Sequence, residues 1–248
     1  MLQPPPLTGV VERRLLVNYR TDPDTTARLL PAPLRPRLVN GWAVAGICLI
    51  RLGRLRPRHM PAVVGLRSEN AAHRIAVEWD TGAGTRSGVY IPRRDTGSLA
   101  NAALGGRLFP GEHHRARFDT QETASDLRVA FASTDATAHA DVRVRAAAGW
   151  TGGELFADLG EASEFFRQDT DGYSATGDAR RLEGLRLGTD AWSVEPVEVL
   201  DAASSFFDDR ARFPAGTATL DCALLMRDVP VVWDPLPSMR VAAMRVAA

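Results

Sequence analysis

Residues Ala72–Arg93 read AHRIAVEWDTGAGTRSGVYIPR, and this stretch decides the fold class. Two runs of alternating apolar and polar residues, Ala72–Asp80 and Ser87–Arg93, flank the segment TGAGT. A period of two residues is typical of a strand with one buried face, and closely spaced glycines favour a tight turn between strands. The stretch therefore predicts an antiparallel β-hairpin.

Similar strand patterns recur along the rest of the chain. Further strands are predicted at Arg14–Arg20, Trp42–Leu52, Leu127–Ala132, Asp141–Ala147, Thr217–Met226 and Val229–Trp233. Helices are fewer, and they are predicted at residues 25–30 behind the N-cap Asp22, at Ser98–Leu104, at Glu161–Arg167 and near Ser204–Arg210.

Many strands at short spacing with few helices are typical of a mainly β protein, so we expect an antiparallel β-barrel or a double-sheet cone. Strands reach from the N-terminal part of the chain to its end. Residues 11–248 are therefore expected to form a single domain, preceded by a loose, proline-rich arm at residues 1–10.

The composition narrows the classes of partner. The formal net charge is zero, which argues against a broad nucleic-acid surface or a patch for anionic membranes. No run approaches the roughly 18 apolar residues of a membrane span, and the first residues lack the pattern of a secretory signal. Cys48 and Cys222 both lie in apolar runs, which indicates buried free thiols and a cytoplasmic protein.

All 30 basic residues are arginines, and the chain contains no lysine. A guanidinium stays protonated and is no nucleophile, so no side-chain amine is present to form a Schiff base with a carbonyl substrate.

Some polar residues share a strand face with apolar ones. His73 shares its face with the odd-numbered apolar residues up to Trp79, and Arg93 shares its face with Val89 and Ile91. Burying an unpaired charge is costly, so an inward Arg93 implies a carboxylate partner or a polar cavity. A structural ion pair between Arg93 and Glu69 and a ligand cavity are the two alternatives.

The Phe-Pro-Gly corner at residues 109–111 leads into another candidate strand. Alternation places His114 on the inward face with Ala116 and Phe118, and it separates His114 from His113, which is expected to face outward. No metal-binding spacing of histidines is present, so no metal or other cofactor is expected, and a site built from His73, His114 and Glu69 stays an alternative.

Three segments resemble acetoacetate decarboxylases. They are NYRTDPDTTARLLPAPLRP at residues 18–36, DTGSLANAALGGRLFPGE at residues 95–112 and VPVVWDPL at residues 229–236. The resemblance implies a β-cone fold with a central cavity that takes a small-molecule ligand, and it implies homo-oligomers. SENAAHRIAVEWD and GVYIPRRDT are more similar to a bacterial branch of this superfamily with no assigned reaction.

The resemblance also bears on the chemistry. The family's Schiff-base lysine follows the corner proline, where this chain has Gly111 and Glu112. Glu69 matches the family's active-site acid, and Arg13 is the best match to its N-terminal arginine. Schiff-base decarboxylation is therefore not expected.

Two functions follow as hypotheses. The first is acid–base chemistry on a small oxo or carboxylate compound, and the second is a binding module that has lost its chemistry. In the first, Glu69 and Glu112 exchange protons, with His73 and His114 as supporting donors. The residues expected to contact the ligand are Arg93, Asn70, Tyr90, Arg13 and Phe109.

Overall fold

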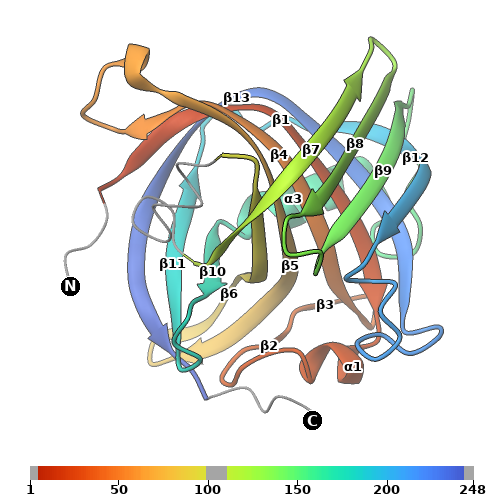
Figure 1. Cartoon of the computed structure of the whole chain (residues 1–248). Helices are drawn as coiled ribbons and strands as arrows, with labels where there is room; N and C mark the ends of the chain where they lie inside the picture. The colour runs from red at the N-terminus through yellow and green to blue at the C-terminus, as the bar shows by residue number, and fades with distance from the viewer. Residues whose placement is uncertain (1–4, 99–110, 243–248) are drawn as a thin grey trace.

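The computed structural model describes residues 5–98 and 111–242, which form a curved, mainly β structure (Figure 1). Within these residues thirteen strands belong to one mixed sheet. The strands are β1 (Leu7–Thr21), β2 (Arg35–Pro36), β3 (Leu38–Val39), β4 (Trp42–Pro57), β5 (Leu66–Thr81), β6 (Gly84–Thr96), β7 (His113–Glu122), β8 (Asp126–Ser133), β9 (His139–Ala146), β10 (Asp171–Ala175), β11 (Arg181–Gly188), β12 (Glu195–Ser204) and β13 (Ala218–Arg240). The described helices are α1 (Pro23–Ala27), the 3-10 turn η1 (Ala62–Val64) and α3 (Leu159–Gln168).

The sheet closes on itself twice, because β6 and β13 each pair with three other strands. β13, β1, β4, β5 and β6 are neighbours in that order. β10 and β11 join β6 back to β13 on one side. β7, β8, β9 and β12 join the same two strands on the other side. The five shared strands therefore present one face to each closure.

The two faces of the shared strands pack against different partners. One face carries residues such as Leu15, Ile47 and Ile75, which join the largest core cluster together with residues of β8, β9 and β12. The opposite face carries Leu16 and Cys48, which pack against α3 through Phe166. Helix α3 thus covers this second face of the shared strands.

The predicted hairpin is confirmed, since β5 and β6 pair antiparallel around the turn at Gly82 and Ala83. The helix at Glu161–Arg167 is confirmed as part of α3. Asp22 also caps α1 as predicted, because its side chain accepts a hydrogen bond from the Thr25 backbone N–H at 2.7 Å.

Other expectations need correction. β1 begins at Leu7, which is buried in the core, so residues 7–10 belong to the sheet and not to a loose arm. Residues 205–213 form turns rather than a helix. The two strands predicted at the end of the chain are one strand, β13, which bends at Asp228, where φ is 51°. The helix predicted at Ser98–Leu104 falls almost entirely outside the described residues.

An irregularity in β6 changes which side chains share a face. Arg93 pairs with His73 and Tyr90 pairs with Ile75, so two β6 residues, Ile91 and Pro92, stand opposite the single residue Arg74. Such a bulge reverses the alternation beyond it. The prediction that Arg93 shares a face with Val89 and Ile91 is therefore wrong. Tyr90 joins the main core and Ile91 packs on the α3 side.

Candidate functional site

A cavity of about 140 Å³ lies between the α3 side of the shared strands and strands β10, β11 and β13. Arg14, Arg74 and Arg94 border it, together with Cys48 and His113. An apolar wall, continuous with a neighbouring hydrophobic cluster, borders it as well, and this wall is formed by Val11, Leu52, Leu185, Leu187 and Trp233.

The strand register builds the polar part of the cavity. Leu16, Cys48, Ala72 and Arg94 form one row across β1, β4, β5 and β6, because each pairs with the next. Directly paired residues of antiparallel strands project on the same face of the sheet. The small side chain of Ala72 separates Cys48 from Arg94, which leaves open space between the thiol and the guanidinium.

The adjacent row places Arg74 opposite Gly46, and Gly46 opposite Asn18. The Arg74 Nη2 donates a short hydrogen bond to the Asn18 Oδ1 across this glycine. A Cβ on residue 46 would lie 2.4 Å from the Val17 carbonyl oxygen and 3.2 Å from the Arg74 Nη2. Gly46 is therefore required for the close approach of the strands and for the path of the Arg74 side chain.

Arg74 is a buried cation that has no carboxylate within ion-pair distance in the described part of the chain, although the Asp169 carboxylate of the same cavity interacts with it electrostatically. Only 4% of its surface is exposed, its Nε has no hydrogen-bond partner among the described residues, and its guanidinium lies 4.6 Å from the centre of the Phe166 ring. Burial lowers the pKa of Arg74 to about 10. A buried charge without an ion pair is costly, so this arrangement favours binding of an anion in the cavity.

Arg14 and Arg94 add positive charge nearby. The Arg14 Nε donates a hydrogen bond to the Cys48 Sγ at 3.3 Å, and the Arg94 Nε donates one to the Ser174 Oγ at 3.0 Å. Burial lowers the pKa of Arg94 to about 10 as well. Within residues 5–98 and 111–242, no carboxylate lies within ion-pair distance of Arg14 or Arg74.

Asp169 and His113 border the same cavity, as does Asp95, whose carboxylate forms an ion pair with Arg93. Asp169 follows α3, and its Oδ1 accepts a hydrogen bond from the Arg37 Nη1 at 2.5 Å, while burial raises the pKa of its carboxyl group. Burial lowers the pKa of His113 to about 4, so its ring is neutral at pH 7. The His113 Nδ1 lies 3.1 Å from the Gly111 carbonyl oxygen, so Nδ1 carries the hydrogen and Nε2 carries the lone pair.

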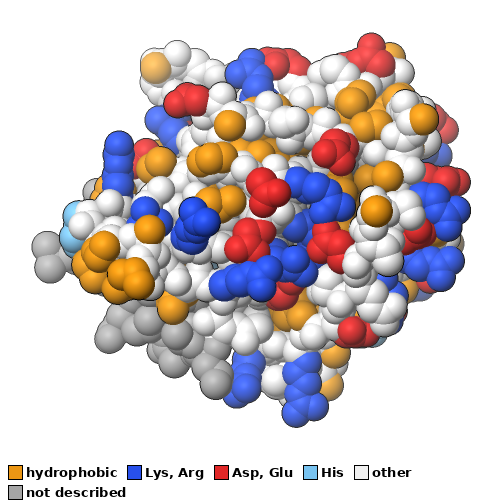
Figure 2. Space-filling view, turned by 90° about the horizontal axis from the view of Figure 1, so that it is seen from above, with side chains coloured by type: hydrophobic (Ala, Val, Ile, Leu, Met, Phe, Trp, Pro, Cys, Tyr) orange, Lys and Arg blue, Asp and Glu red, His pale blue; other side chains and the backbone are white. Residues whose placement is uncertain are grey.

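The sequence assigned these chemical roles to other residues. Glu69 and Arg13, the matches to the family's acid and its N-terminal arginine, form an ion pair: the Arg13 Nη2 lies 2.6 Å from the Glu69 Oε2. Both belong to a charged cluster outside the cavity, where Arg51 binds Glu69 and Glu122, and Arg227 binds Glu122. The strand ends that carry this cluster lie toward the top of Figure 1, and the view from above shows acidic and basic side chains interspersed (Figure 2).

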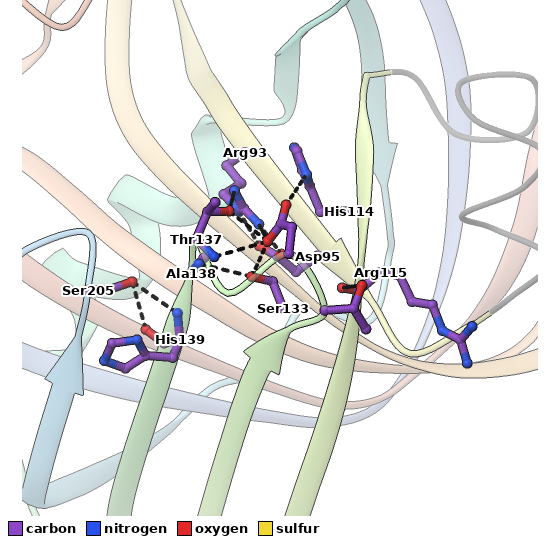
Figure 3. A network of polar contacts seen from close by, with 11 residues as sticks. Arg93, Asp95, His114, Arg115, Ser133, Thr137, Ala138, His139 and Ser205 are labelled. Carbon is purple, nitrogen blue, oxygen red and sulfur yellow. Dashed lines mark hydrogen bonds and ion pairs between the residues drawn. The ribbon is translucent and has the colours of Figure 1, made fainter.

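Arg93 has carboxylate partners of its own and does not border the cavity. Its Nη2 lies 2.8 Å from the Asp95 Oδ1 and 3.5 Å from the Asp135 Oδ1, and its Nη1 donates to the Thr137 Oγ1 at 2.8 Å (Figure 3). The proposed pair with Glu69 is therefore wrong. The structural alternative holds for Arg93 with Asp95 in place of Glu69.

His114 lies on the same face of β7 as Ala116 and Phe118 of the main core, as predicted, but His113 borders the cavity on the opposite face. The His114 Nδ1 lies 3.1 Å from the Asp135 Oδ2 in the network of Figure 3, whereas His113 borders the cavity. β7 pairs with β6 beyond the bulge, and His113 stands opposite Arg94. His113 therefore borders the cavity on the face where an outward orientation was expected.

His73 faces inward as predicted, but it is a core residue. Its ring stacks on Phe206 at a centroid distance of 4.6 Å, and its Nε2 lies 3.5 Å from the Ser204 Oγ. Burial, reinforced by the Arg93 charge, lowers the pKa of His73 to about 3. His73 is therefore neutral and lies on the face opposite the cavity.

The remaining predicted site residues divide between the cavity and other places. Asn70 borders the cavity, and its Oδ1 accepts a hydrogen bond from the Thr96 Oγ1 at 2.7 Å. Tyr90 is buried in the main core, and Glu112 is exposed. Phe109 lies outside the described residues.

The alternative metal site is not assembled. Glu69, His73 and His114 have the separate partners described above. Across the described parts of the chain, no group of three or more histidine, cysteine, aspartate or glutamate side chains is arranged to hold a metal ion. The described helices are also too short or too polar to cross a membrane.

Sequence reasoning missed Arg74, Arg94, Asp169 and Cys48 as site residues. Alternation places Arg74 on the face opposite His73, and the pattern of β5 alone does not show that α3 covers this face. A signal was present in the amphipathic helix at Glu161–Arg167, whose apolar side requires a sheet face to cover.

Solved structures with the same fold were found at low sequence identity. The acetoacetate decarboxylase of Legionella pneumophila subsp. pneumophila str. Philadelphia 1 matches with a TM-score of 0.60 and 12% identity, over 97% of this chain and 88% of that chain. An acetoacetate decarboxylase-like enzyme from Sphingomonas wittichii RW1 matches with a TM-score of 0.58 and 15% identity, over 98% and 95% of the two chains. The enduracididine biosynthesis enzyme MppR, complexed with pyruvate, matches with a TM-score of 0.56 and 13% identity, over 99% and 93%.

Identities this low show the fold and not the reaction. A search of curated proteins found no match to this chain. The DUF2071 family, described as an uncharacterized conserved protein, matches residues 10–229. The chain therefore belongs to the DUF2071 family and has the acetoacetate decarboxylase-like fold.

Proposed function

We propose that this protein binds a small carboxylate of the oxo-acid class in the arginine-lined cavity. The observation that carries the proposal is Arg74, a buried cation that borders the cavity and has no carboxylate within ion-pair distance among the described residues. A ligand carboxylate between Arg74 and Arg94 supplies Arg74 with a counter-charge at ion-pair distance. Guanidinium groups match the geometry of a carboxylate with two parallel hydrogen bonds.

The size and walls of the cavity limit the ligand further. A cavity of about 140 Å³ is close to the engineered cavity of about 150 Å³ that holds benzene in another protein. The ligand therefore has about six to nine non-hydrogen atoms. A carboxylate at the arginines leaves the rest of such a molecule near the apolar wall that includes Leu185 and Trp233. The solved structure of MppR with pyruvate supports this ligand class, because a protein of the same fold binds a small oxo acid.

The cavity also holds groups suited to proton transfer. Asp169 has a raised pKa, and neutral His113 has a lone pair on Nε2, so either can accept a proton from the carbon next to a carbonyl group. The arginines stabilise the negative charge that develops on the carbonyl oxygen. Acid–base chemistry without a Schiff base is therefore the proposed reaction, carried out by different residues than the sequence suggested.

Calorimetric titration of pyruvate, 2-oxobutyrate and 2-oxoisovalerate tests the binding. We expect saturable binding that falls at least tenfold in Arg74→Met, which keeps an unbranched stem but removes the charged guanidinium group. Arg117→Met is the matched control, because Arg117 is exposed on β7, away from the cavity. Equal binding by the two variants would contradict the proposal.

Exchange of the C3 hydrogens of 2-oxobutyrate for deuterium, followed by proton NMR, tests the chemistry. An enzyme that removes this proton accelerates the exchange, and Asp169→Asn or His113→Gln slows it. Tight binding with no acceleration in the native protein would instead support a binding module without catalysis.

A further inference from the structure

The two cysteines lie on the same side of the shared strands but in different surroundings. Cys222 is 3% exposed and belongs to the apolar cluster under α3, where burial raises the pKa of its thiol to about 12. Its Sγ accepts a hydrogen bond from the Asn18 Nδ2 at 3.4 Å. Cys222 does not border the cavity and has the surroundings of an inert structural thiol.

Cys48 borders the cavity and lies among cations. The Arg14 Nε donates to its Sγ at 3.3 Å. Arg94 stands two strands away in the same row, beyond the small side chain of Ala72, and Arg74 stands in the next row. Both guanidinium groups interact electrostatically with Cys48. A cysteine in positively charged, ligand-accessible surroundings is typical of a reactive thiol.

Arg74 gives an independent indication that a ligand binds beside this thiol. Its side chain is buried, its Nε has no hydrogen-bond partner within residues 5–98 and 111–242, and it borders the same cavity as Cys48. A carboxylate held by Arg74 places the neighbouring carbon of an oxo acid on the same sheet face as the Cys48 Sγ. No lysine is present to attack that carbon.

We propose that Cys48 is the nucleophile of the cavity and adds reversibly to the carbonyl carbon of a bound 2-oxo acid. The sulfur–carbon bond forms while the π-electron pair of the carbonyl moves to its oxygen, and the thiol proton ends on that oxygen. The product is a thiohemiketal with the same atoms as the two reactants, so no oxidant, reductant or further reactant is needed. This inference rests on the proposed binding of an oxo acid in the cavity.

Alkylation of the native protein compares the two thiols directly. Iodoacetate carries a carboxylate, whereas iodoacetamide is neutral and of similar size. We expect iodoacetate to modify Cys48 at least tenfold faster than Cys222, as measured by peptide mass spectrometry, and pyruvate to protect Cys48. Arg74→Met is expected to slow the reaction of Cys48 with iodoacetate more than its reaction with iodoacetamide. Equal modification of the two cysteines, or a Cys48 that reacts only after unfolding, would overturn the proposal.

Carbon NMR with pyruvate labelled at C2 tests the covalent step. We expect a protein-bound signal in the region of tetrahedral carbon that disappears in Cys48→Ala and persists in Cys222→Ala. Binding of pyruvate by calorimetry without this signal overturns the role of Cys48 and leaves the proposed function intact. Failure of all the oxo acids to bind overturns both.

Discussion

Arg93 and Arg94 are consecutive residues, yet they lie on opposite sides of the sheet. Arg93 pairs with Asp95 on the side of the main core, and Arg94 borders the cavity. The bulge at Ile91 and Pro92 sets which arginine faces which side. Proline has no backbone N–H to donate to the neighbouring strand, so it is tolerated at such a position. Pro92 was the one sign of the bulge in residues 87–93, because proline within a sheet is confined to edges and bulges, whereas the alternation of the other residues alone did not show it.

This pair of arginines gives a prediction about stability and binding. Arg93→Met leaves Asp95, which is fully buried, without its cation, so we expect a loss of about 3–5 kcal/mol of unfolding free energy. Arg94→Met is expected to weaken oxo-acid binding at least tenfold with a smaller loss of stability. Urea unfolding and calorimetry check both variants. A large loss of stability in Arg94→Met together with weakened binding in Arg93→Met would contradict the position of the bulge at Ile91 and Pro92.

His73 gives a prediction about pH. Its pKa in the folded protein is about 3, whereas the unfolded chain has the ordinary value of about 6.5, so the unfolded chain binds the proton more readily. Its contribution to stability is therefore complete above about pH 6.5 and is lost as the pH falls toward 3, by up to about 1.4 kcal/mol per pH unit.

We expect His73→Phe, which keeps an aromatic ring beside Phe206, to reduce the stability lost between pH 7 and pH 5 by about 2 kcal/mol. His139→Gln, at an exposed position, is the control and keeps the native pH dependence. Urea unfolding at the two pH values measures the difference. A variant with the native pH dependence would show that His73 is not held neutral.

At the scale of elements, helix α3 covers the cavity and depends on its cap. The Asp158 side chain accepts a hydrogen bond from the Glu161 backbone N–H at 2.8 Å, and the Glu161 carboxylate accepts one from the Ala157 N–H at 2.8 Å. Phe166, near the other end of the helix, lies over Arg74. The cap therefore supports the helix that forms part of the cavity wall.

We expect Asp158→Ala to lower the free energy of unfolding by about 1 kcal/mol, because the helix loses its N-cap acceptor. Asp158→Asn retains an acceptor at the same place and is expected to stay close to the native value. Thermal unfolding compares the two variants. An equal loss in both would indicate that the charge, and not the hydrogen bond, is the stabilising feature.

The sequence predicted most of the strands and helices but not the residues at which each of them begins and ends. Alternation identified the strands of the central hairpin, and the Asp-Pro pair identified the start of α1. β13 was divided in two because Arg227 and Asp228 interrupt an apolar run. In the structure, Arg227 pairs with Arg13 and Val229 with Val11, so Asp228 is accommodated as an irregularity within one strand. Such irregularities depend on the neighbouring strand and leave little trace in the local pattern.

At the scale of the whole molecule, five shared strands separate a filled core from a cavity. The sequence predicted a mainly β fold with a cavity, and it placed the cavity on the face of His73. That face is filled by the main core, while the opposite face is hollow. β11 and β12 pair with different parts of β13, and these pairings determine which face of the shared strands is filled and which is hollow. Pairing between segments so distant in the chain has no signal in the local sequence.

The charged cluster around Glu69 joins β1, β4, β5, β7 and β13 through ion pairs, and it gives the last prediction. Arg13 is fully buried and has its shortest ion pair with Glu69, while burial lowers the pKa of the Arg13 guanidinium. We expect Glu69→Gln to cost about 3–5 kcal/mol of unfolding free energy, because a buried cation loses its main partner. Oxo-acid binding by the folded variant is expected to stay within about threefold of native, a difference of about 0.7 kcal/mol. A large loss of binding in Glu69→Gln with native stability would show that Glu69 belongs to the ligand site.

A crystal structure of the protein with 2-oxobutyrate tests the proposed ligand binding most directly. We expect the ligand carboxylate between the guanidinium groups of Arg74 and Arg94, with its carbonyl carbon toward the Cys48 Sγ and its ethyl group toward the apolar wall. A ligand bound instead at Arg93 or at the cluster around Glu69, with the cavity between α3 and the sheet filled only by water, would contradict it.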